Sequence, residues 1–556
     1  MNLKDLLTKG YFPEEILPPF TSEDLEFVIT TVIADIDNLD PITKHKKKKI
    51  SQLATYSTPK IKAYRRNLAI PNPLHYIRLS DTIVRHWGNI TTHCSKSSIS
   101  LSRLKVKAGS NRALLKPSFD VATREKILRS TGYRYLLKID VAKCYGSIYT
   151  HSIPWALHTK GVSKKKRDRV HLIGNELDED CRKLQDGQTV GLPIGPDSSR
   201  IISEIILSCI DVEIENQLKY LTGIRVIDDY HLYFKSQGDL EIARSIIHKT
   251  LKEYELELNQ SKEKLRDLPE AVDNEWFSII RDFRFRNKWN YQRSDLITYF
   301  DMVLLNARKF PDDLVLTYAM SKLRFTVFSA KNWNILQSLM LNALIIEPKI
   351  IPYIAQNLIS YQSNHYKINT TLVSEALEEF ILFHSRLYND FEVAWALWIL
   401  KSLRINISEP IAKILSDSTN SVVILTTLDL HQAGFIPLGL NLTNWTTMLT
   451  ADNLYSENWL VAYEAKMKGW LTTGFDYISK DPFFKILKDN NVSFYKENRK
   501  LDLSKVKVNS TSAYFEDSGV EDEIDEVDQD TVFKSITPVQ SQAVPDLTFE
   551  DDDSLF

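Results

Sequence analysis

Three aspartates of this sequence, Asp140, Asp228 and Asp229, follow or join short apolar runs that predict buried strands. YRYLLKIDV (133–141) is a candidate strand that ends in an acid, and GIRVIDDYHLYF (223–234) predicts two strands that meet at an Asp-Asp turn. A buried carboxylate is costly unless it is paired or bound to a cation. Two divalent ions held by such acids, about 3.5–4 Å apart, support in-line phosphoryl transfer to an attacking hydroxyl.

The context of these acids separates them from the other Asp-Asp pairs of the chain. Asp312-Asp313 and Asp551–Asp553 are predicted to lie in a loop and in the tail. Around the strand-end acids the pattern reads strand, helix, helix, hairpin, helix, strand, which predicts an α+β unit on an antiparallel sheet. A Gly/Pro turn, GLPIGPD (191–197), precedes one of its helices, whose apolar residues fall at helical spacing.

The flanking regions are predicted to differ from this unit. Residues 1–60 are expected to be helical, and 64–116 to form strands and turns with a basic surface. After about residue 292, helical periodicity recurs without a fixed repeat, so either an irregular solenoid or a bundle is possible. The segments with this periodicity are 314–328, 333–346, 350–361, 371–388, 391–404 and 408–416. Four tryptophans of this region are expected in the core: Trp395, Trp398, Trp459 and Trp470.

Composition narrows the class of protein. The 556 residues carry a net charge of −2, but residues from Glu516 onward hold −13 and the rest +11. A basic body favours an acidic partner, with nucleic acid first, and the acidic tail has the composition of a disordered segment. The four cysteines form no CxxC pair, and neither a signal peptide nor a membrane helix is predicted, so a cytoplasmic location is expected.

Taken in chain order, four segments resemble the motifs of reverse transcriptases. DVAKCYGSI (140–148) is similar to motif A, GLPIGPDSS (191–199) to motif B, RVIDDY (225–230) to the YxDD motif C, and LELNQSK (256–262) to motif D. With the basic segment before them, this resemblance covers about 64–265.

Further segments resemble the abortive-infection and defence-associated bacterial reverse transcriptases, the Abi/DRT group of the unknown-group enzymes. They are RRNLAIPNPLHYIRLS (65–80), GPDSSRIISEIILSCID (195–211), VAWALWILKSL (393–403) and YEAKMKGWL (463–471). The resemblance implies palm and fingers on an antiparallel sheet, then a large all-α, helical-repeat-like C-terminal domain. The implied divisions are an N-terminal helical segment (1–60), fingers and palm (61–290), the helical domain (291–500) and an acidic tail (501–556).

The resemblance also implies roles for single residues. Asp140 and Asp228 would be the principal Mg²⁺ ligands, with Asp229 as a supporting third carboxylate. Tyr145 would be the steric gate that favours deoxynucleotides, and Lys262 would neutralise or protonate the leaving pyrophosphate. Weaker candidates for nucleotide contacts are Gly195, Arg65, Arg66 and Arg78.

Each of these residues also has an ordinary structural interpretation. Asp140 alone is a strand-end residue, Tyr145 a core aromatic and Lys262 a solvated lysine. Two positions depart from the family pattern: Val226 replaces the usual aromatic of motif C, and Ile194 the glutamine of many templated enzymes. Both changes could loosen template reading. Some abortive-infection members start DNA from a tyrosine hydroxyl of the protein without a conventional template, and the 24 tyrosines here do not reveal a priming residue.

Two functions therefore stand. The first is a Mg²⁺-dependent DNA polymerase of the reverse transcriptase type in antiviral defence, with dNTPs and RNA or DNA as partners. A noncoding RNA or companion defence protein, and a homo- or hetero-oligomer, are further expected partners, and no membrane is. The alternative is a catalytically weak nucleic-acid-binding scaffold subunit of a defence complex.

Overall fold

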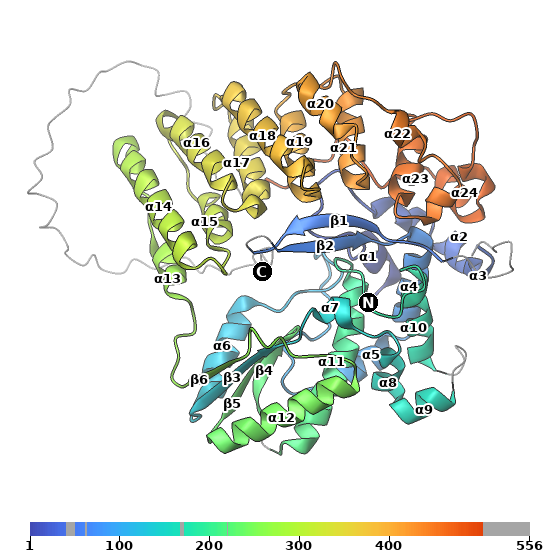
Figure 1. The fold of residues 1–556 in the computed structure, drawn as a ribbon, viewed down its shortest axis with the longest axis vertical. Helices are drawn as coiled ribbons and strands as arrows, with labels where there is room; N and C mark the ends of the chain where they lie inside the picture. The colour runs from blue at the N-terminus through green and yellow to red at the C-terminus, as the bar shows by residue number, and fades with distance from the viewer. Residues whose placement is uncertain (40–49, 62–63, 167–171, 220, 504–556) are drawn as a thin grey trace, which may run out of the picture.

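The computed structural model describes residues 1–39, 50–61, 64–166, 172–219 and 221–503. A four-stranded sheet with its helices forms the lower part of the molecule in Figure 1, and a layer of helices forms the upper part. A two-stranded hairpin lies between the two. The predicted α+β class, with an antiparallel sheet and a large helical C-terminal region, is confirmed.

The four-stranded sheet, here called the palm sheet, is antiparallel throughout, with the order β4-β5-β3-β6. Its strands are β3 (Tyr135–Asp140), β4 (Thr222–Val226), β5 (Asp229–Phe234) and β6 (Lys264–Asp267). Helix α12 (Gln237–Glu253) packs against β3 and β5, and α6 (Phe119–Ser130) against β4 and β5. The remaining palm helices are α7 (Cys144–Ser147), α8 (Ser152–His158), α9 (Lys160–Lys165), α10 (Ile173–Lys183) and α11 (Asp197–Gln217).

Helix α11 is the central buried helix of the palm. Its apolar residues at the predicted helical spacing are buried, among them Ile201, Ile205 and Ile210. Pro196 is its N-cap residue, directly before the first turn, where a missing backbone N–H costs nothing. The Gly/Pro turn of motif B therefore enters a rigid helix that packs against α5, α8 and α12.

The prediction of strands and turns over 64–116 is only partly correct. Strand β2 (Arg65–Ile70) pairs with β1 (Ala54–Pro59), but two helices follow, α4 (Pro73–Arg85) and α5 (Trp87–Cys94). Asn72 caps α4 by accepting a hydrogen bond from Leu74 N, and Pro73 occupies the first turn. Pro73, in the region predicted to form strands and turns, thus starts a helix. The segment before the hairpin holds α1 (Leu3–Thr8), η1 (Glu23–Phe27), α2 (Ile29–Ala34) and α3 (Ile36–Leu39).

The helical C-terminal region confirms the six predicted helices and adds others. The predicted ones are α15 (Val315–Leu323), α16 (Trp333–Leu344), α17 (Ile351–Ser363), α18 (Thr370–Ser385), α19 (Asp390–Ser402) and α20 (Glu409–Leu415). The others are α13 (Glu275–Asp282), α14 (Trp289–Lys309), η2 (Ala330–Asn332), η3 (Pro348–Ile350), α21 (Ser421–Gln432), α22 (Thr443–Thr446), η4 (Asp452–Tyr455), α23 (Trp459–Met467), η5 (Ile478–Lys480) and α24 (Pro482–Asp489). The four tryptophans pack in or against the core as expected.

The helical region is anchored on the β1–β2 hairpin. The Arg65 guanidinium donates two hydrogen bonds of 2.7 Å to the buried Glu392 carboxylate of α19. Trp459 Nε1 donates to the carbonyl of Ile70, and Asn72 Nδ2 to that of Leu454. Strand β1 begins before the predicted division at residue 60, so the hairpin crosses that division.

Some segments lie outside the described residues. They are a lysine-rich stretch at Lys44 and Lys46–Lys49, part of a basic stretch over 164–169, and nearly all of the predicted acidic tail. Among the helices that the structure describes, none combines the length and apolarity needed to cross a bilayer.

Candidate active site

The three aspartates meet at one end of the palm sheet. Asp140 is the last residue of β3 and lies directly opposite Asp229, the first residue of β5. In an antiparallel pair, opposite Cβ atoms are about 4.5–5.5 Å apart. The connection from β4 to β5 consists of Ile227 and Asp228, so Asp229 belongs to the strand and not to the predicted Asp-Asp turn. Ile227 has a φ of 56°, a strained value for a β-branched residue, and such strain is found at functional sites.

The chain segment of motif D, 256–262, lies beside the end of β3 that carries Asp140. Leu258 forms a bridge with Val141, Ala142 N donates to Glu257 O at 2.8 Å, and Asn259 N donates to Asp140 O at 2.8 Å. This backbone pairing delivers Lys262, whose Nζ lies 2.5 Å from Asp140 Oδ2. The structure therefore brings Lys262 to the carboxylates, as the sequence predicts.

The site has an excess of negative charge. Asp140 is nearly buried, with 9% of its side chain exposed. Desolvation, followed by the charge of Asp140, raises the pKa of Asp228. Desolvation and the charges of Asp228 and Asp140 likewise raise the pKa of Asp229, while Lys262 opposes the shift. Three carboxylates at one sheet end thus repel one another in the absence of more positive charge.

A fully buried arginine, Arg225, is hydrogen-bonded to the β4–β5 turn. Arg225 Nε donates to Asp211 Oδ2 at 2.9 Å, and its Nη1 and Nη2 each donate to Glu204 at 2.9 Å. Nη1 also donates to Ile227 O in the turn at 2.8 Å. Tyr230 Oη donates to Asp211 Oδ1. Sequence reasoning missed this residue. An arginine within an apolar strand is a signal for it, because a buried arginine needs a buried acidic partner.

Tyr145 and the motif B turn lie against each other. Leu192 N donates to Tyr145 O at 2.7 Å, and Tyr145 is half-buried, its pKa raised by desolvation, with Arg200 and Asp228 among the charges that act on it. Gly195 has a φ of 124°, and a Cβ there would lie 2.6 Å from Pro13 Cγ, so only glycine suits this turn. Ile194 O accepts from Ala69 N of β2 at 2.8 Å, which ties the turn to the β1–β2 hairpin.

The arginines proposed for nucleotide contacts separate in the structure. Arg66 is exposed on β2, and its charge acts on Asp228. Arg65 turns to Glu392 of the helical region, and the buried Arg78 donates to Asp37 and to Ile36 O. Only Arg66 of the three is thus brought towards the carboxylates. The sequence did not single out Lys60. Desolvation lowers the pKa of this lysine, and the charges of Lys262, Asp140 and Asp228 also act on it.

The residues suit a divalent cation by their chemistry. Carboxylate oxygens are the donors that Mg²⁺ prefers, and the mutual repulsion of the aspartates would be relieved by a cation. Within the described residues, no three His, Cys, Asp or Glu side chains already stand together as a metal-binding group. Lys262 pairs with one oxygen of Asp140. Asp140 and Asp228 would hold the ion, and the lysine would then be released toward a triphosphate.

Comparison with known families agrees with this geometry. Residues 84–273 match the family described as "Reverse transcriptase (RNA-dependent DNA polymerase)". The matched segment includes Asp140, Tyr145, Asp228, Asp229 and Lys262. It identifies a reverse transcriptase domain and with it the enzyme class of RNA-directed DNA polymerases, which are nucleotidyltransferases. Polymerases of this family generally use divalent metal ions.

Other comparisons are more distant. No curated protein matches the chain. Apo telomerase of Candida tropicalis truncated from the C-terminal domain aligns at 15% identity and a TM-score of 0.30, over 46% of this chain and 57% of that one. Telomerase of Candida albicans, in complex with a TWJ fragment of telomeric RNA, aligns at 14% identity and a TM-score of 0.29, over 72% and 68%. A further structure of apo telomerase from Candida tropicalis aligns at 12% identity and a TM-score of 0.31, over 74% of this chain and 71% of that one. TM-scores this low carry no conclusion about this chain.

Proposed function

We propose that this protein is a Mg²⁺-dependent DNA polymerase of the reverse transcriptase type that acts in antiviral defence. The observation that carries the proposal is the convergence of Asp140, Asp228, Asp229 and Lys262 at one end of the palm sheet. They come from three separate chain segments, and the family match covers all of them.

Each of these side chains has a task in the proposed reaction. Asp140 and Asp228 would hold Mg²⁺, with Asp229 as the third carboxylate, and a bound ion would supply activation of the attacking hydroxyl and stabilisation of the leaving pyrophosphate. Lys262 exchanges its bond to Asp140 for the triphosphate and can give a proton to the pyrophosphate. Tyr145 closes the place of a ribose 2′-hydroxyl. Gly195 allows the close turn beside it.

The role in defence rests on the resemblance to abortive-infection enzymes at four segments, two of which lie in the helical region. Protein priming from a tyrosine and synthesis without a conventional template belong to the same proposal, as do a noncoding RNA or companion protein and an oligomer. Val226 and Ile194 support loose template reading. Val226 lies opposite Asp229 in the palm sheet, and Ile194 lies in the motif B turn. Both side chains are aliphatic and cannot form a hydrogen bond with a base.

A scaffold role is the second candidate. It is favoured by the large helical region and by Val226 and Ile194, the two positions that depart from the family pattern. Binding of RNA that persists in Asp228→Ala with Asp229→Ala, together with undiminished protection against phage, would support the scaffold over the polymerase.

The test is incubation of the full chain with each labelled dNTP and Mg²⁺, followed by sequencing of any product. The polymerase proposal expects polymer from the wild type and none from the alanine double variant. A random or homopolymeric product disfavours RNA copying, and a defined sequence found in a bound RNA supports it. No polymer from the wild type, or equal polymer from both proteins, contradicts the proposal.

A further inference from the structure

The turn between β4 and β5 has a backbone conformation that its sequence does not favour. Ile227 is the first of the two turn residues, and its φ is 56°. Two-residue hairpin turns favour a positive φ at this place, and glycine, asparagine or aspartate usually supplies it. Isoleucine is strained there, because its side chain branches at Cβ. Asp228 follows directly, so the conformation of Ile227 determines where this carboxylate points.

Both backbone polar groups of Ile227 are hydrogen-bonded to side chains from other parts of the palm. The N–H donates to Ser102 Oγ at 2.6 Å, and the carbonyl accepts from Arg225 Nη1 at 2.8 Å. The carbonyl of Asp228 accepts from Val141 N at 3.2 Å. The two bonds at Ile227 fix the peptide groups on either side of its Cα, so together they oppose a return of φ to negative values.

Ser102 belongs to a short segment that lies along β4. Arg225 N donates to Ile99 O at 2.7 Å, and Leu101 N donates to Arg225 O at 2.8 Å. These bonds form a parallel bridge between Ser100 and Arg225. Ser102 N also donates to Ser100 Oγ at 3.2 Å. The position of the Ser102 hydroxyl is therefore set by pairing with the strand that enters the turn.

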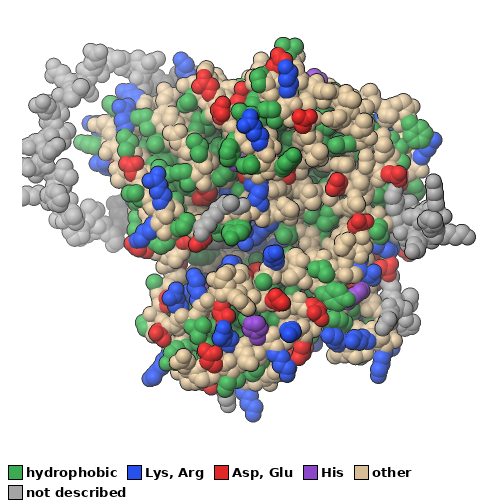
Figure 2. All heavy atoms as spheres, in the orientation of Figure 1, with side chains coloured by type: hydrophobic (Ala, Val, Ile, Leu, Met, Phe, Trp, Pro, Cys, Tyr) green, Lys and Arg blue, Asp and Glu red, His purple; other side chains and the backbone are tan. Residues whose placement is uncertain are grey.

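The carboxylates lie on the open side of this turn. Asp229 is exposed, and Asp228 is half-buried. The motif B turn, which is bonded to both α7 and β2, places this end of the palm near the β1–β2 hairpin (Figure 1). Figure 2 shows the surface hollowed between the palm and the helical layer. Because a substrate must reach the carboxylates from the open side, the contacts that fix the turn come from within the palm.

We propose that Ser102 is a positioning residue of the active site. Its hydroxyl, together with Arg225, keeps Ile227 at a positive φ and so directs Asp228 toward Asp140. The effect on metal binding rests on the proposed function, whereas the effect on the turn does not. Side chains that orient a metal ligand typically contribute about 10–100-fold to metal affinity. Loss of the hydroxyl should therefore weaken metal binding and lower kcat, while KM for dNTP changes little.

The test compares Ser102→Thr with Ser102→Val, since these two side chains have nearly the same shape and only threonine carries a hydroxyl. Binding of Mn²⁺ to the full chain, followed by EPR without dNTP, should be about 10–100-fold weaker in Ser102→Val. Ser102→Thr should bind Mn²⁺ as the wild type does. The control is Ser98→Ala, in the same segment, whose lost hydroxyl donates to Glu215 of α11, and it should also match the wild type.

A readout of the turn itself needs no metal. Amide hydrogen exchange of the peptide over 224–230 should be about tenfold faster or more in Ser102→Val than in Ser102→Thr, because the Ile227 N–H loses its acceptor. Equal exchange and equal Mn²⁺ binding in these two variants would overturn the inference.

A second background separates strain in the turn from packing of the segment. Glycine adopts a positive φ without strain, so in Ile227→Gly the further change Ser102→Val should weaken Mn²⁺ binding by no more than about threefold. A loss as large as in the Ile227 background would overturn the inference. If the wild type neither makes DNA nor binds Mn²⁺, the proposed function alone fails, and the exchange measurement still decides the role of Ser102.

Discussion

Replacement of Arg225 by methionine should release the β4–β5 turn that carries Asp228. Arg225 is fully buried and is bonded to two buried acids, Glu204 and Asp211, as well as to the Ile227 carbonyl. Methionine has a comparable length and leaves both carboxylates without their counterion. Removal of one partner from a buried ion-pair network typically costs about 3–5 kcal/mol.

The magnitude follows from the geometry. At an effective dielectric constant of about 20, each acid at these distances gains roughly 4 kcal/mol from the guanidinium. Protonation limits the loss, because desolvation raises the pKa of Asp211 even with Arg225 present, so one carboxylate takes up a proton when the arginine is removed. After this protonation, we expect the folded β4–β5 hairpin to be destabilised by about 3–5 kcal/mol.

Hydrogen exchange of the peptide over 222–234 measures this local cost. The free energy of opening should fall by about 3–5 kcal/mol in Arg225→Met, which corresponds to an exchange rate roughly 10²–10⁴-fold higher. A triple variant that adds Glu204→Gln and Asp211→Asn removes both stranded charges and should recover at least about half of the loss. A change under about 1 kcal/mol, or a triple variant no more protected than the single one, would refute the reasoning.

Three further predictions follow from charge and shape. Desolvation raises the pKa of the fully buried Glu464 from 4.5 to about 7. Its contribution to the free energy of unfolding is therefore fully present below pH 4.5, and about 3 kcal/mol of it is lost as the pH rises through 7. The Tm advantage of Glu464→Gln over the wild type should grow from pH 5 to pH 8, and a constant difference would contradict this. In Tyr145→Ala, ribonucleotide incorporation should rise at least about tenfold relative to deoxynucleotides, because the proposed gate is removed; unchanged selectivity would show that another residue excludes the 2′-hydroxyl. Deletion of 516–556, which removes a charge of −13, should tighten RNA or DNA binding at low salt and have little effect at high salt; equal affinity at low salt would count against competition by the tail.

The positions of the three aspartates could be predicted because the signals for them are local. Each aspartate follows or joins an apolar run, and the run specifies both the strand and the acid beside it. The six predicted helices were equally accessible, since apolar residues recur in each at helical spacing, even in α19, which is buried throughout from Phe391 to Leu400. Helix α21 was not, because SVVILTTLDL is buried on all sides and rich in β-branched residues, a pattern that a buried strand shares.

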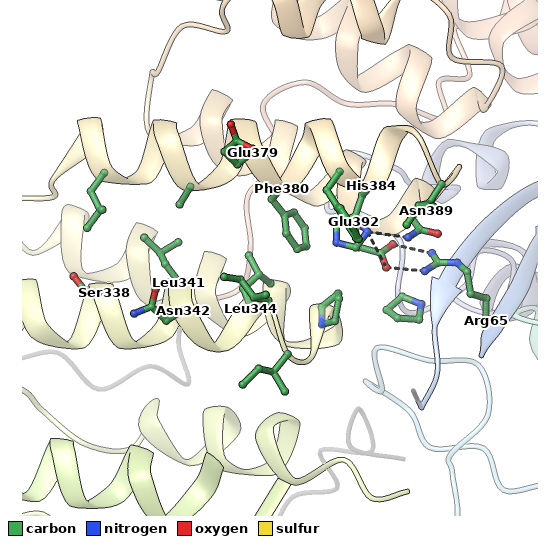
Figure 3. A pocket seen from close by; sticks show the side chains of 18 of the residues that line it. Arg65, Ser338, Leu341, Asn342, Leu344, Glu379, Phe380, His384, Asn389 and Glu392 are labelled. Carbon is green, nitrogen blue, oxygen red and sulfur yellow. Dashed lines mark hydrogen bonds and ion pairs between the residues drawn. The ribbon is translucent and has the colours of Figure 1, made fainter. Parts of the chain in front are cut away.

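Contacts between distant segments could not be predicted in this way. Arg65 pairs with Glu392, which lies 327 residues away, so no local pattern distinguishes it from Arg66 as a nucleotide contact. This contact exists only because the helical region packs against the β1–β2 hairpin (Figure 3).

The central claim is that the aspartates at the end of the palm sheet polymerise deoxynucleotides. Its most direct test compares incorporation of labelled dNTPs in Mg²⁺ by the wild type, by Asp228→Asn and by the matched control Asp312→Asn, whose Asp-Asp pair lies in a turn after α14. The account predicts equal DNA synthesis by the wild type and the control, and a loss of at least about 10³-fold in Asp228→Asn. Synthesis by Asp228→Asn at the wild-type rate would contradict it.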